Sequence, residues 1–220
     1  MSKKPRSKFV ESFLNPKEPG REVTPGKMDL AGIPLGLRSA KWADFEALPE
    51  VLPVRNYVAS LRGAVKAGDG VFIGGGRSTG KSRIAAYIAK AAIWHRFEVI
   101  WVTALTMQDR IYSREVMDDP EDPVSWASKF RNVPVLVVDD FGGELEGVRG
   151  ANRVVQVLRD RQTWKRPTII TSSFAVNGIV GAYGDGYDDW LFDNFLCVIL
   201  ETKAPRPRVG DRYAEGQDGH

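Results

Sequence analysis

The sequence has 220 residues, of which 43% are hydrophobic, and a formal net charge of +3 with a pI near 9.0. This length allows one sizeable core but not two full domains, and no apolar stretch approaches the roughly 18 to 20 residues of a membrane span. The single cysteine, Cys197, excludes an internal disulfide framework and is expected in the core; with only two histidines, no zinc cluster can form within one chain. The basic balance is compatible with nucleic acid as a partner, and we expect a cytoplasmic protein without a membrane contact.

The first 30 residues are polar and contain several prolines, which predicts a partly disordered tail with at most one short helix over 9–14. Beyond the tail, apolar runs of strand length alternate with helical patterns. We expect strands at 71–73, 98–103, 133–140, 168–172 and 195–201. We expect helices at 49–65, 83–92, 107–113, around 126 and at 151–164. The alternation predicts an α/β fold over 31–208, a parallel five-stranded sheet flanked by helices on both faces, with a flexible tail at 209–220.

The segment 71–82, VFIGGGRSTGKS, runs from an apolar strand into a GxxxxGK[ST] phosphate loop and then into a helix. We expect its glycines at 74, 75, 76 and 80 to adopt backbone conformations closed to residues with a Cβ, so that N–H groups converge on phosphate oxygens. Lys81 is placed to reach the β and γ phosphates of ATP, where it would act in catalysis, and the Ser82 hydroxyl can ligand Mg²⁺. The predicted nucleotide-binding residues of this loop are Gly75, Gly76, Arg77, Ser78, Thr79, Gly80, Lys81 and Ser82.

A second motif, VPVLVVDD at 133–140, is a short apolar run that ends in two carboxylates. This is the pattern of a buried parallel strand whose carboxyl end points into a ligand crevice, the Walker B strand of P-loop enzymes. We assign Asp139 to the Mg²⁺ ion and Asp140 to activation of the attacking water. The two motifs together predict an ATPase that hydrolyses ATP to ADP and phosphate.

Around these motifs the chain resembles the AAA+ helicase loaders of the DnaC and DnaI type and the related transposition helper ATPases of the IstB type. The upstream segment LAGIPLGLRSAKWADFEALP is similar to the family's GIP segment, with its following arginine and aromatic residue. DDFGGE at 139–144 resembles the family's extension of Walker B, and RQTWKRPTIITSS at 161–173 resembles its R…PTIITSN stretch. The resemblance covers about residues 30–208 and implies a P-loop NTPase fold of the AAA+ type.

The resemblance also implies roles for further residues. Ser173 takes the position of the polar sensor 1 residue, usually asparagine, that contacts the attacking water or the γ-phosphate. Arg206 falls where the family has a sensor 2 type arginine. The family's Asp-Arg-Leu, whose arginine acts in trans, reads Asp189, Trp190, Leu191 here, so we expect slow or partner-stimulated hydrolysis. Other arginines are alternatives for the missing group or belong to a solvated basic helix face: Arg149, Arg153, Arg159, Arg161 and Arg166.

As to partners, the resemblance implies a hexameric replicative helicase of the DnaB type, single-stranded DNA, and self-association on nucleotide or DNA. Residues 9–14 are a candidate apolar anchor for the helicase, or part of a solubilising tail. Cations and aromatics between the phosphate loop and the Walker B strand suit single-stranded DNA, although Trp126 and Phe130 also fit the apolar stripe of a short helix. The alternative functions are an IstB-type helper acting on double-stranded DNA with a transposase, and a P-loop regulator or small-molecule kinase. The candidate DNA-contacting residues are Arg110, Tyr112, Arg114, Trp126, Lys129, Phe130 and Arg131.

Overall fold

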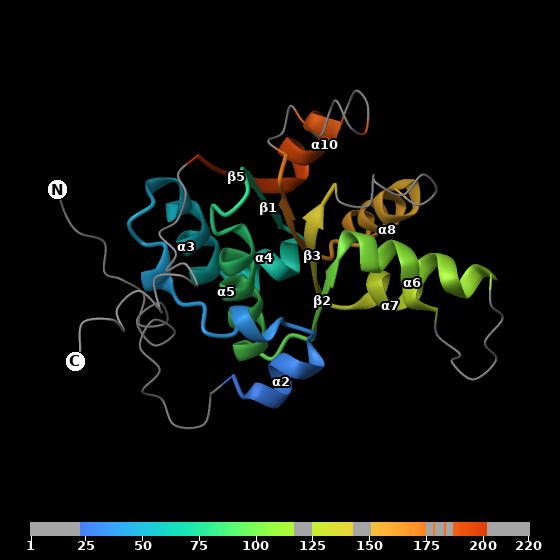
Figure 1. The fold of residues 1–220 in the computed structure, drawn as a ribbon, viewed down its shortest axis with the longest axis horizontal. Coiled ribbons are helices and arrows are strands. Elements are labelled where there is room, and N and C mark those ends of the chain that lie inside the picture. The colour runs from blue at the N-terminus through green and yellow to red at the C-terminus, as the bar shows by residue number, and fades with distance from the viewer. Residues whose placement is uncertain are drawn as a thin grey trace, which may run out of the picture.

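The computed structural model describes residues 23–116, 125–142, 151–174, 178, 183 and 187–201. Five parallel strands form one sheet in the order β2-β3-β4-β1-β5 (Figure 1). Their bounds are β1 Gly70–Gly75, β2 Val99–Thr103, β3 Val135–Phe141, β4 Thr168–Ser172 and β5 Phe195–Leu200. The predicted parallel five-stranded sheet is therefore confirmed. No helix among the described residues is long and apolar enough to cross a membrane.

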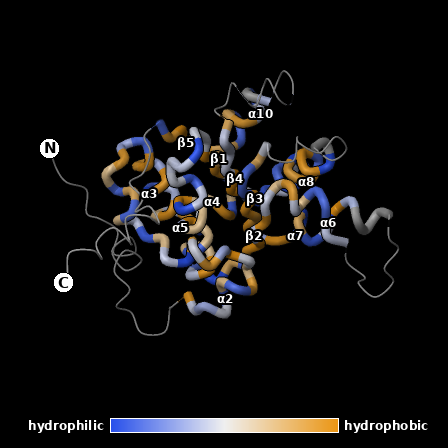
Figure 2. The backbone as a smooth tube through the Cα atoms, viewed as in Figure 1, coloured by the Kyte–Doolittle hydropathy of each residue, from blue (hydrophilic) through white to orange (hydrophobic). Residues whose placement is uncertain are grey.

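Helices cover both faces of the sheet, as Figure 1 shows, because successive strand residues point to opposite sides. Val71 and Ile73 of β1 join one buried cluster, built with the helices before β2, whereas Phe72 joins a second cluster built with those after it. The hydropathy view places the apolar strands between these two layers (Figure 2). The helices of the first layer are α2 Pro25–Leu30, α3 Leu52–Ala59, α4 Leu61–Ala67 and α5 Lys81–Trp94. Those of the second layer are α6 Ala104–Val116, α7 Trp126–Asn132, α8 Ala151–Thr163 and α10 Tyr187–Asn194.

The single helix expected over 49–65 is wrong in detail, because the chain forms a 3-10 turn, Pro49–Val51, and then the separate helices α3 and α4. The break falls at Ser60, whose hydroxyl donates to the carbonyls of Asn56 and Tyr57 at 3.0 and 3.3 Å. A serine side chain that bonds its own preceding turn competes with continuation of the helix. Helix α6 also begins three residues earlier than expected, directly at the end of β2.

The segment before α3 is fastened across α5, the helix that follows the phosphate loop. Lys90 donates to the carbonyls of Arg38 and Ala40, both at 2.8 Å, and Arg83 pairs with Asp44 at 2.5 Å. The rings of Phe45 and Tyr87 pack edge to face with centroids 5.4 Å apart. Polar and aromatic contacts therefore fix this segment beside the nucleotide loop.

Cys197 of β5 is only half-buried, at the edge of the second cluster, so its expected place inside the core is wrong; burial still raises the pKa of its thiol to about 11. The tail helix at 9–14, the tail at 209–220 and Arg206 lie outside the described residues.

Candidate nucleotide-binding site

The phosphate loop follows β1 directly and ends at the first turn of α5. Gly75 and Gly80 have φ angles of 133° and 101°, in the region that favours glycine. At Gly75 an added Cβ would lie 2.3 Å from the Leu200 carbonyl oxygen of β5. Gly74 and Gly76 have no positive φ, so the expected backbone conformation, closed to residues with a Cβ, is found at Gly75 and Gly80 only. Gly74 is crowded, since an added Cβ would lie 2.8 Å from Ile199 Cδ1 and 3.0 Å from the Phe174 carbonyl oxygen, whereas at Gly76 the nearest atom would be Thr79 Cγ2 at 4.0 Å.

Lys81 lies at the start of α5 and is only 9% exposed. Its Nζ donates to the carbonyls of Gly75 at 2.8 Å and Gly76 at 2.7 Å, so the ammonium group is held over the loop itself. The Thr79 hydroxyl also donates to the Gly76 carbonyl, at 3.0 Å. Arg77 and Ser78 are exposed at the tip of the loop, and Ser78 has a φ of 66°. The loop is thus closed by its own hydrogen bonds, with its lysine directed at the bend that would receive phosphate.

The phosphate loop and the Walker B strand meet at Asp139, near the end of β3. Asp139 Oδ1 accepts a hydrogen bond of 2.8 Å from the Ser82 hydroxyl, although the two residues are 57 positions apart. A hydroxyl and a carboxylate oxygen side by side are the hard oxygen donors that Mg²⁺ prefers, and Mg²⁺ commonly keeps waters and takes further ligands from phosphate oxygens. The donor set therefore fits a magnesium ion bound with ATP, which Ser82 and Asp139 would hold.

Asp140 is exposed and has a φ of 58°, a left-handed conformation that non-glycine residues adopt rarely and that collects at functional sites. The register between β3 and β4 shifts between Val138 and Phe141, so the strand bends where this carboxylate leaves the sheet. The Ser173 hydroxyl lies 3.4 Å from Asp140 Oδ1, at the end of the neighbouring strand. The structure thus brings Asp140 and Ser173 together at the carboxyl edge beside Asp139.

Thr171 of β4 is a site residue that the sequence reasoning missed. It is 1% exposed, its hydroxyl donates to Asp139 Oδ1 at 2.5 Å, and it accepts the backbone N–H of Asp140 at 3.0 Å. One hydroxyl therefore holds both acids. The only signal in the sequence was a polar residue within the apolar run TIITS, two positions before Ser173.

The arginines suggested as trans-acting groups differ in their exposure to solvent. Arg161 is fully buried and donates to Thr168 and to main-chain carbonyls, so both earlier interpretations, an intersubunit arginine and a solvated face, are wrong for it. Burial, with a contribution from Arg166, lowers its pKa to about 9, which leaves it charged at neutral pH. Arg153 and Arg159 are exposed on α8, and Arg149 lies outside the described residues.

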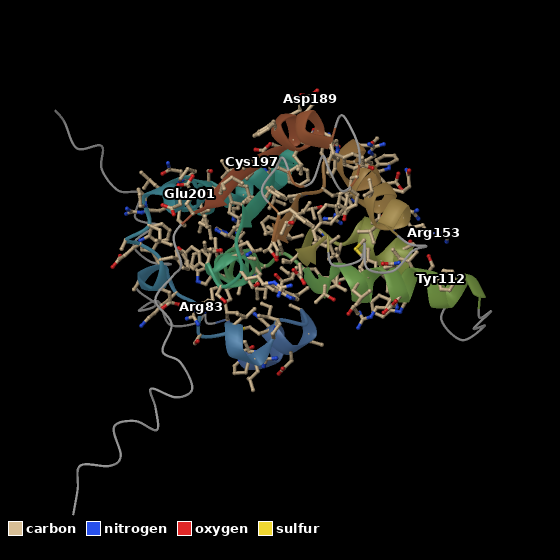
Figure 3. All side chains as sticks on the ribbon, turned by 45° about the horizontal axis from the view of Figure 1, so that its top comes forward. Arg83, Tyr112, Arg153, Asp189, Cys197 and Glu201 are labelled. Atoms are coloured by element: carbon tan, nitrogen blue, oxygen red, sulfur yellow. The ribbon has the colours of Figure 1, made fainter. Side chains whose placement is uncertain are left out.

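Trp190, at the position of the family's finger, has a structural contact instead. Its indole Nε1 donates to Gln162 Oε1 of α8 at 2.5 Å, and its ring packs edge to face on Phe195 with centroids 5.2 Å apart. The neighbouring Asp189 lies on the outer side of α10 in Figure 3. Tryptophan here joins α10 to α8 and β5.

The candidate DNA-contacting aromatics between the motifs also differ in their exposure to solvent. Phe130 is fully buried and its ring packs on Trp126 at 5.4 Å, which confirms the apolar stripe and excludes Phe130 from base stacking. The Trp126 ring is covered by the guanidinium of Arg110 at 4.3 Å and by Lys129 at 4.8 Å. Tyr112 is 43% exposed on α6, at the end of the domain where Figure 3 also shows Arg153.

A parallel sheet of this order, with a phosphate loop after β1 and paired acids ending β3, defines a P-loop NTPase of the AAA+ type. The sequence profile of the family described as "IstB-like ATP binding protein" matches residues 28–197, and the chain belongs to this ATP-binding family. The resemblance seen in the sequence is thereby confirmed. No curated protein matches the chain.

Solved structures share the fold at low sequence identity. The DnaC helicase loader superposes with a TM-score of 0.55 and 18% identity, over 69% of this chain and 88% of that one. A putative primosome component from Streptococcus pyogenes serotype M3 gives 0.53 and 18%, over 89% and 99%. The replication initiator DnaA, bound to AMPPCP and single-stranded DNA, gives 0.61 and 15%, over 75% and 51%. These likenesses show the AAA+ fold.

Proposed function

We propose that this protein hydrolyses ATP slowly, with Mg²⁺ as its metal. In this proposal Lys81 binds the β and γ phosphates, Ser82 and Asp139 hold the metal, and Asp140 orients and deprotonates the attacking water. A bound Mg²⁺ would neutralise charge on the phosphate oxygens. Support comes above all from the convergence of Ser82 and Thr171 on one oxygen of Asp139, since it joins the phosphate loop, β3 and β4 at a single atom.

Ser173 would sense the state of the nucleotide. Its hydroxyl can donate and accept, but it is shorter than asparagine, and its contact of 3.4 Å with Asp140 suits a role through that acid or a bridging water. Trp190 cannot stabilise charge on a transferring phosphoryl group, which is why we expect slow turnover unless a partner supplies an arginine. Arg206 stays a prediction for the nucleotide contact from the C-terminal side.

We further propose that this protein is a cytoplasmic helicase loader controlled by its bound nucleotide. It would grip a hexameric DnaB-type helicase and help to place it on single-stranded DNA. The family membership and the fold shared with the DnaC loader support this proposal. The interlock of α5 with the GIP segment adds a physical route, because Arg83 and Lys90 of that helix hold Asp44 and the carbonyls of Arg38 and Ala40. A shift of the nucleotide loop would move this segment.

The test is co-purification of the full chain with a replicative helicase, in ATP and in ADP, read by mass spectrometry. We expect a complex whose amount depends on the nucleotide, and we expect Lys81→Ala to remove that dependence. A complex of equal strength in ATP, ADP and no nucleotide would contradict the switch. Recovery of no helicase would contradict the loader function while leaving the ATPase proposal open to its own assay.

A transposition helper is the second candidate, because the matching family is described by IstB. Such a protein would assemble on double-stranded DNA and engage a transposase. The same experiment with candidate transposases and duplex DNA separates the two. A nucleotide-dependent transposase complex without a helicase complex would replace the loader by the helper.

A further inference from the structure

Trp164 is the most exposed aromatic side chain among the described residues, at 71%. It lies just after α8, in the turn that leads into β4. This turn is at the amino-terminal end of the parallel strands, whereas Asp139 and Ser173 are at their carboxyl ends. An indole left in water at the end of the sheet opposite the nucleotide site is unexplained by the ATPase, since it contacts none of the loop or Walker B residues.

The turn that carries Trp164 is rigidly built. Trp164 N–H donates to the Asp160 carbonyl at 3.1 Å, and Lys165 N–H donates to the Gln162 carbonyl at 2.9 Å. Lys165 has a φ of 50°, and Gly68 packs so closely on it that an added Cβ would lie 2.5 Å from Lys165 Cα. The indole is therefore presented on a fixed backbone, which reduces the entropy lost when a ligand binds.

Two arginines join this turn to the end of α7. Buried Arg161 donates to the carbonyls of Phe130 and Pro167, both at 2.7 Å. Arg166 Nη1 donates to the Arg131 carbonyl at 2.8 Å and to Asn132 Oδ1 at 2.6 Å. The α8–β4 turn and the end of α7 thus form one surface, which we call the Trp164 platform and define as Arg131, Trp164, Lys165 and Arg166.

The platform is positively charged. Lys165 is exposed and the Arg131 side chain is 41% exposed. Asp160 offsets the charge of Arg131, because its Oδ2 accepts from Arg131 at 2.6 Å while Oδ1 accepts from Gln156 at 2.9 Å, so Lys165 and Arg166 supply the net positive charge. Trp164 follows Asp160 by four residues and its N–H donates to the Asp160 carbonyl, so the acid that pairs with Arg131 lies on the same helix face as Trp164.

We propose that the Trp164 platform binds single-stranded nucleic acid, with Trp164 stacked on an unpaired base while Lys165 and Arg131 contact the flanking phosphates. A flat apolar ring next to cations is the combination that single strands need, and a duplex leaves no base face free to stack. The charge favours a polyanion over an apolar protein surface. The site is separate from Trp126, whose ring already carries Arg110 and Lys129. The inference deepens the DNA contact of the proposed loader and rests on that function only in its biological setting.

The test is fluorescence anisotropy of a labelled oligothymidylate titrated with the full chain. We expect Trp164→Ala to weaken binding by about five-fold or more, the loss typical of one stacked base, and Trp164→Phe to restore most of it. Lys165→Ala should reduce the slope of log affinity against log salt concentration by about 0.7, the value for one phosphate contact with a single strand. Because Trp164 and Lys165 lie far from the phosphate loop, nucleotide affinity should stay unchanged in all three variants.

Phe192→Ala is the matched control, since Phe192 is an exposed aromatic, at 61%, on α10 and outside the platform. Equal weakening by Phe192→Ala and Trp164→Ala would overturn the inference, as would unchanged binding in Trp164→Ala. Equal affinity of the wild type for duplex would overturn base stacking. Trp164→Ala could instead keep its DNA affinity but bind less helicase or self-associate less. The platform would then be a protein interface and the nucleic-acid assignment wrong. A wild-type protein that binds no helicase would contradict the loader function without affecting these comparisons.

Discussion

Thr171 donates a hydrogen bond of 2.5 Å to Asp139 Oδ1, the same oxygen that accepts the Ser82 hydroxyl. Thr171 also accepts the N–H of Asp140, whose backbone is in the left-handed region. The strand that leads to the sensor position is thereby connected to both Walker B acids through a buried residue. We regard Thr171 as a positioning residue for Asp139 and Asp140.

Thr171→Val keeps the shape but removes both hydrogen bonds, and loss of a contact that orients a metal ligand typically costs about 10- to 100-fold in affinity or activity. We expect kcat to fall by that factor with a smaller change in KM, and the Mg²⁺ concentration needed for half-maximal turnover to rise. Thr171→Ser, which keeps the hydroxyl, should recover most of the activity. Equal loss in both variants, with lowered thermal stability, would indicate a packing role alone.

Lys81→Ala should lower the affinity for Mg²⁺-ATP by about ten-fold or more, since a charge-assisted contact to phosphate is removed. Binding can be measured with a fluorescent ATP analogue. Lys90→Ala is a control on the same helix, where Lys90 donates to the carbonyls of Arg38 and Ala40. It should reduce stability and leave the Mg²⁺ dependence of binding unchanged. ATP affinity that survives Lys81→Ala would contradict the phosphate-loop assignment.

Asp140→Asn should leave ATP binding intact and abolish turnover, because an amide cannot take the proton of the attacking water. Asparagine tolerates the left-handed region, so the fold should be unaffected, whereas Asp140→Ala should also lose about 1 kcal/mol of stability. Phosphate release and ATP-analogue binding, measured on the same preparation, separate the two effects. Loss of binding in Asp140→Asn would move this carboxylate to the metal.

Arg161→Met should destabilise the fold by about 3 kcal/mol or more, because it leaves the buried carbonyls of Phe130, Val133 and Pro167 without a donor. Urea unfolding measures this change. Arg159→Ala is the comparison on the same helix. The Arg159 guanidinium lies over the Tyr187 ring at 5.2 Å, and its loss should cost about 0.5 to 1 kcal/mol. A stable Arg161→Met with reduced ATPase would contradict the structural role.

The Asp44 and Arg83 pair should give a pH-dependent contribution to stability. Burial alone would raise the pKa of Asp44, but the hydrogen bond from Arg83 and the N–H of Lys41 lower it below its ordinary value of 3.8. A folded pKa below the unfolded one stabilises the fold above about pH 4, and this contribution is lost as the pH falls through the folded pKa. Asp44→Asn should therefore cost about 1 to 3 kcal/mol at neutral pH.

The unfolding free energies of Asp44→Asn and the wild type should converge in acid, where the wild-type carboxyl becomes protonated. Denaturant unfolding at a series of pH values measures this convergence. Glu46→Gln, a substitution of an exposed acid two positions away, is the control and should change stability little at any pH of the series. A constant difference between Asp44→Asn and the wild type down to strongly acidic pH would contradict the ion pair.

The sequence alone determined the local parts of the site. A strand, a glycine-rich loop and a helix are continuous in the chain, and so are an apolar strand and its two terminal acids, so 71–82 and 133–140 could be interpreted without a structure. The same locality gave the alternation of strands and helices and hence the parallel sheet. The helicase anchor at 9–14 and the nucleotide contact of Arg206 stay predictions.

Only the tertiary structure decided which distant side chains meet. The order β2-β3-β4-β1-β5 places β4 between β1 and β3, and this brings Thr171 against Asp139 and Ser82. Arg161 and Arg159 look alike in the sequence, yet one is buried under α7 and the other exposed, because burial depends on the helix face that meets the sheet. Trp164 is likewise exposed by the turn after α8. Contacts between segments far apart in the chain are set by packing of the whole domain, and no local pattern encodes them.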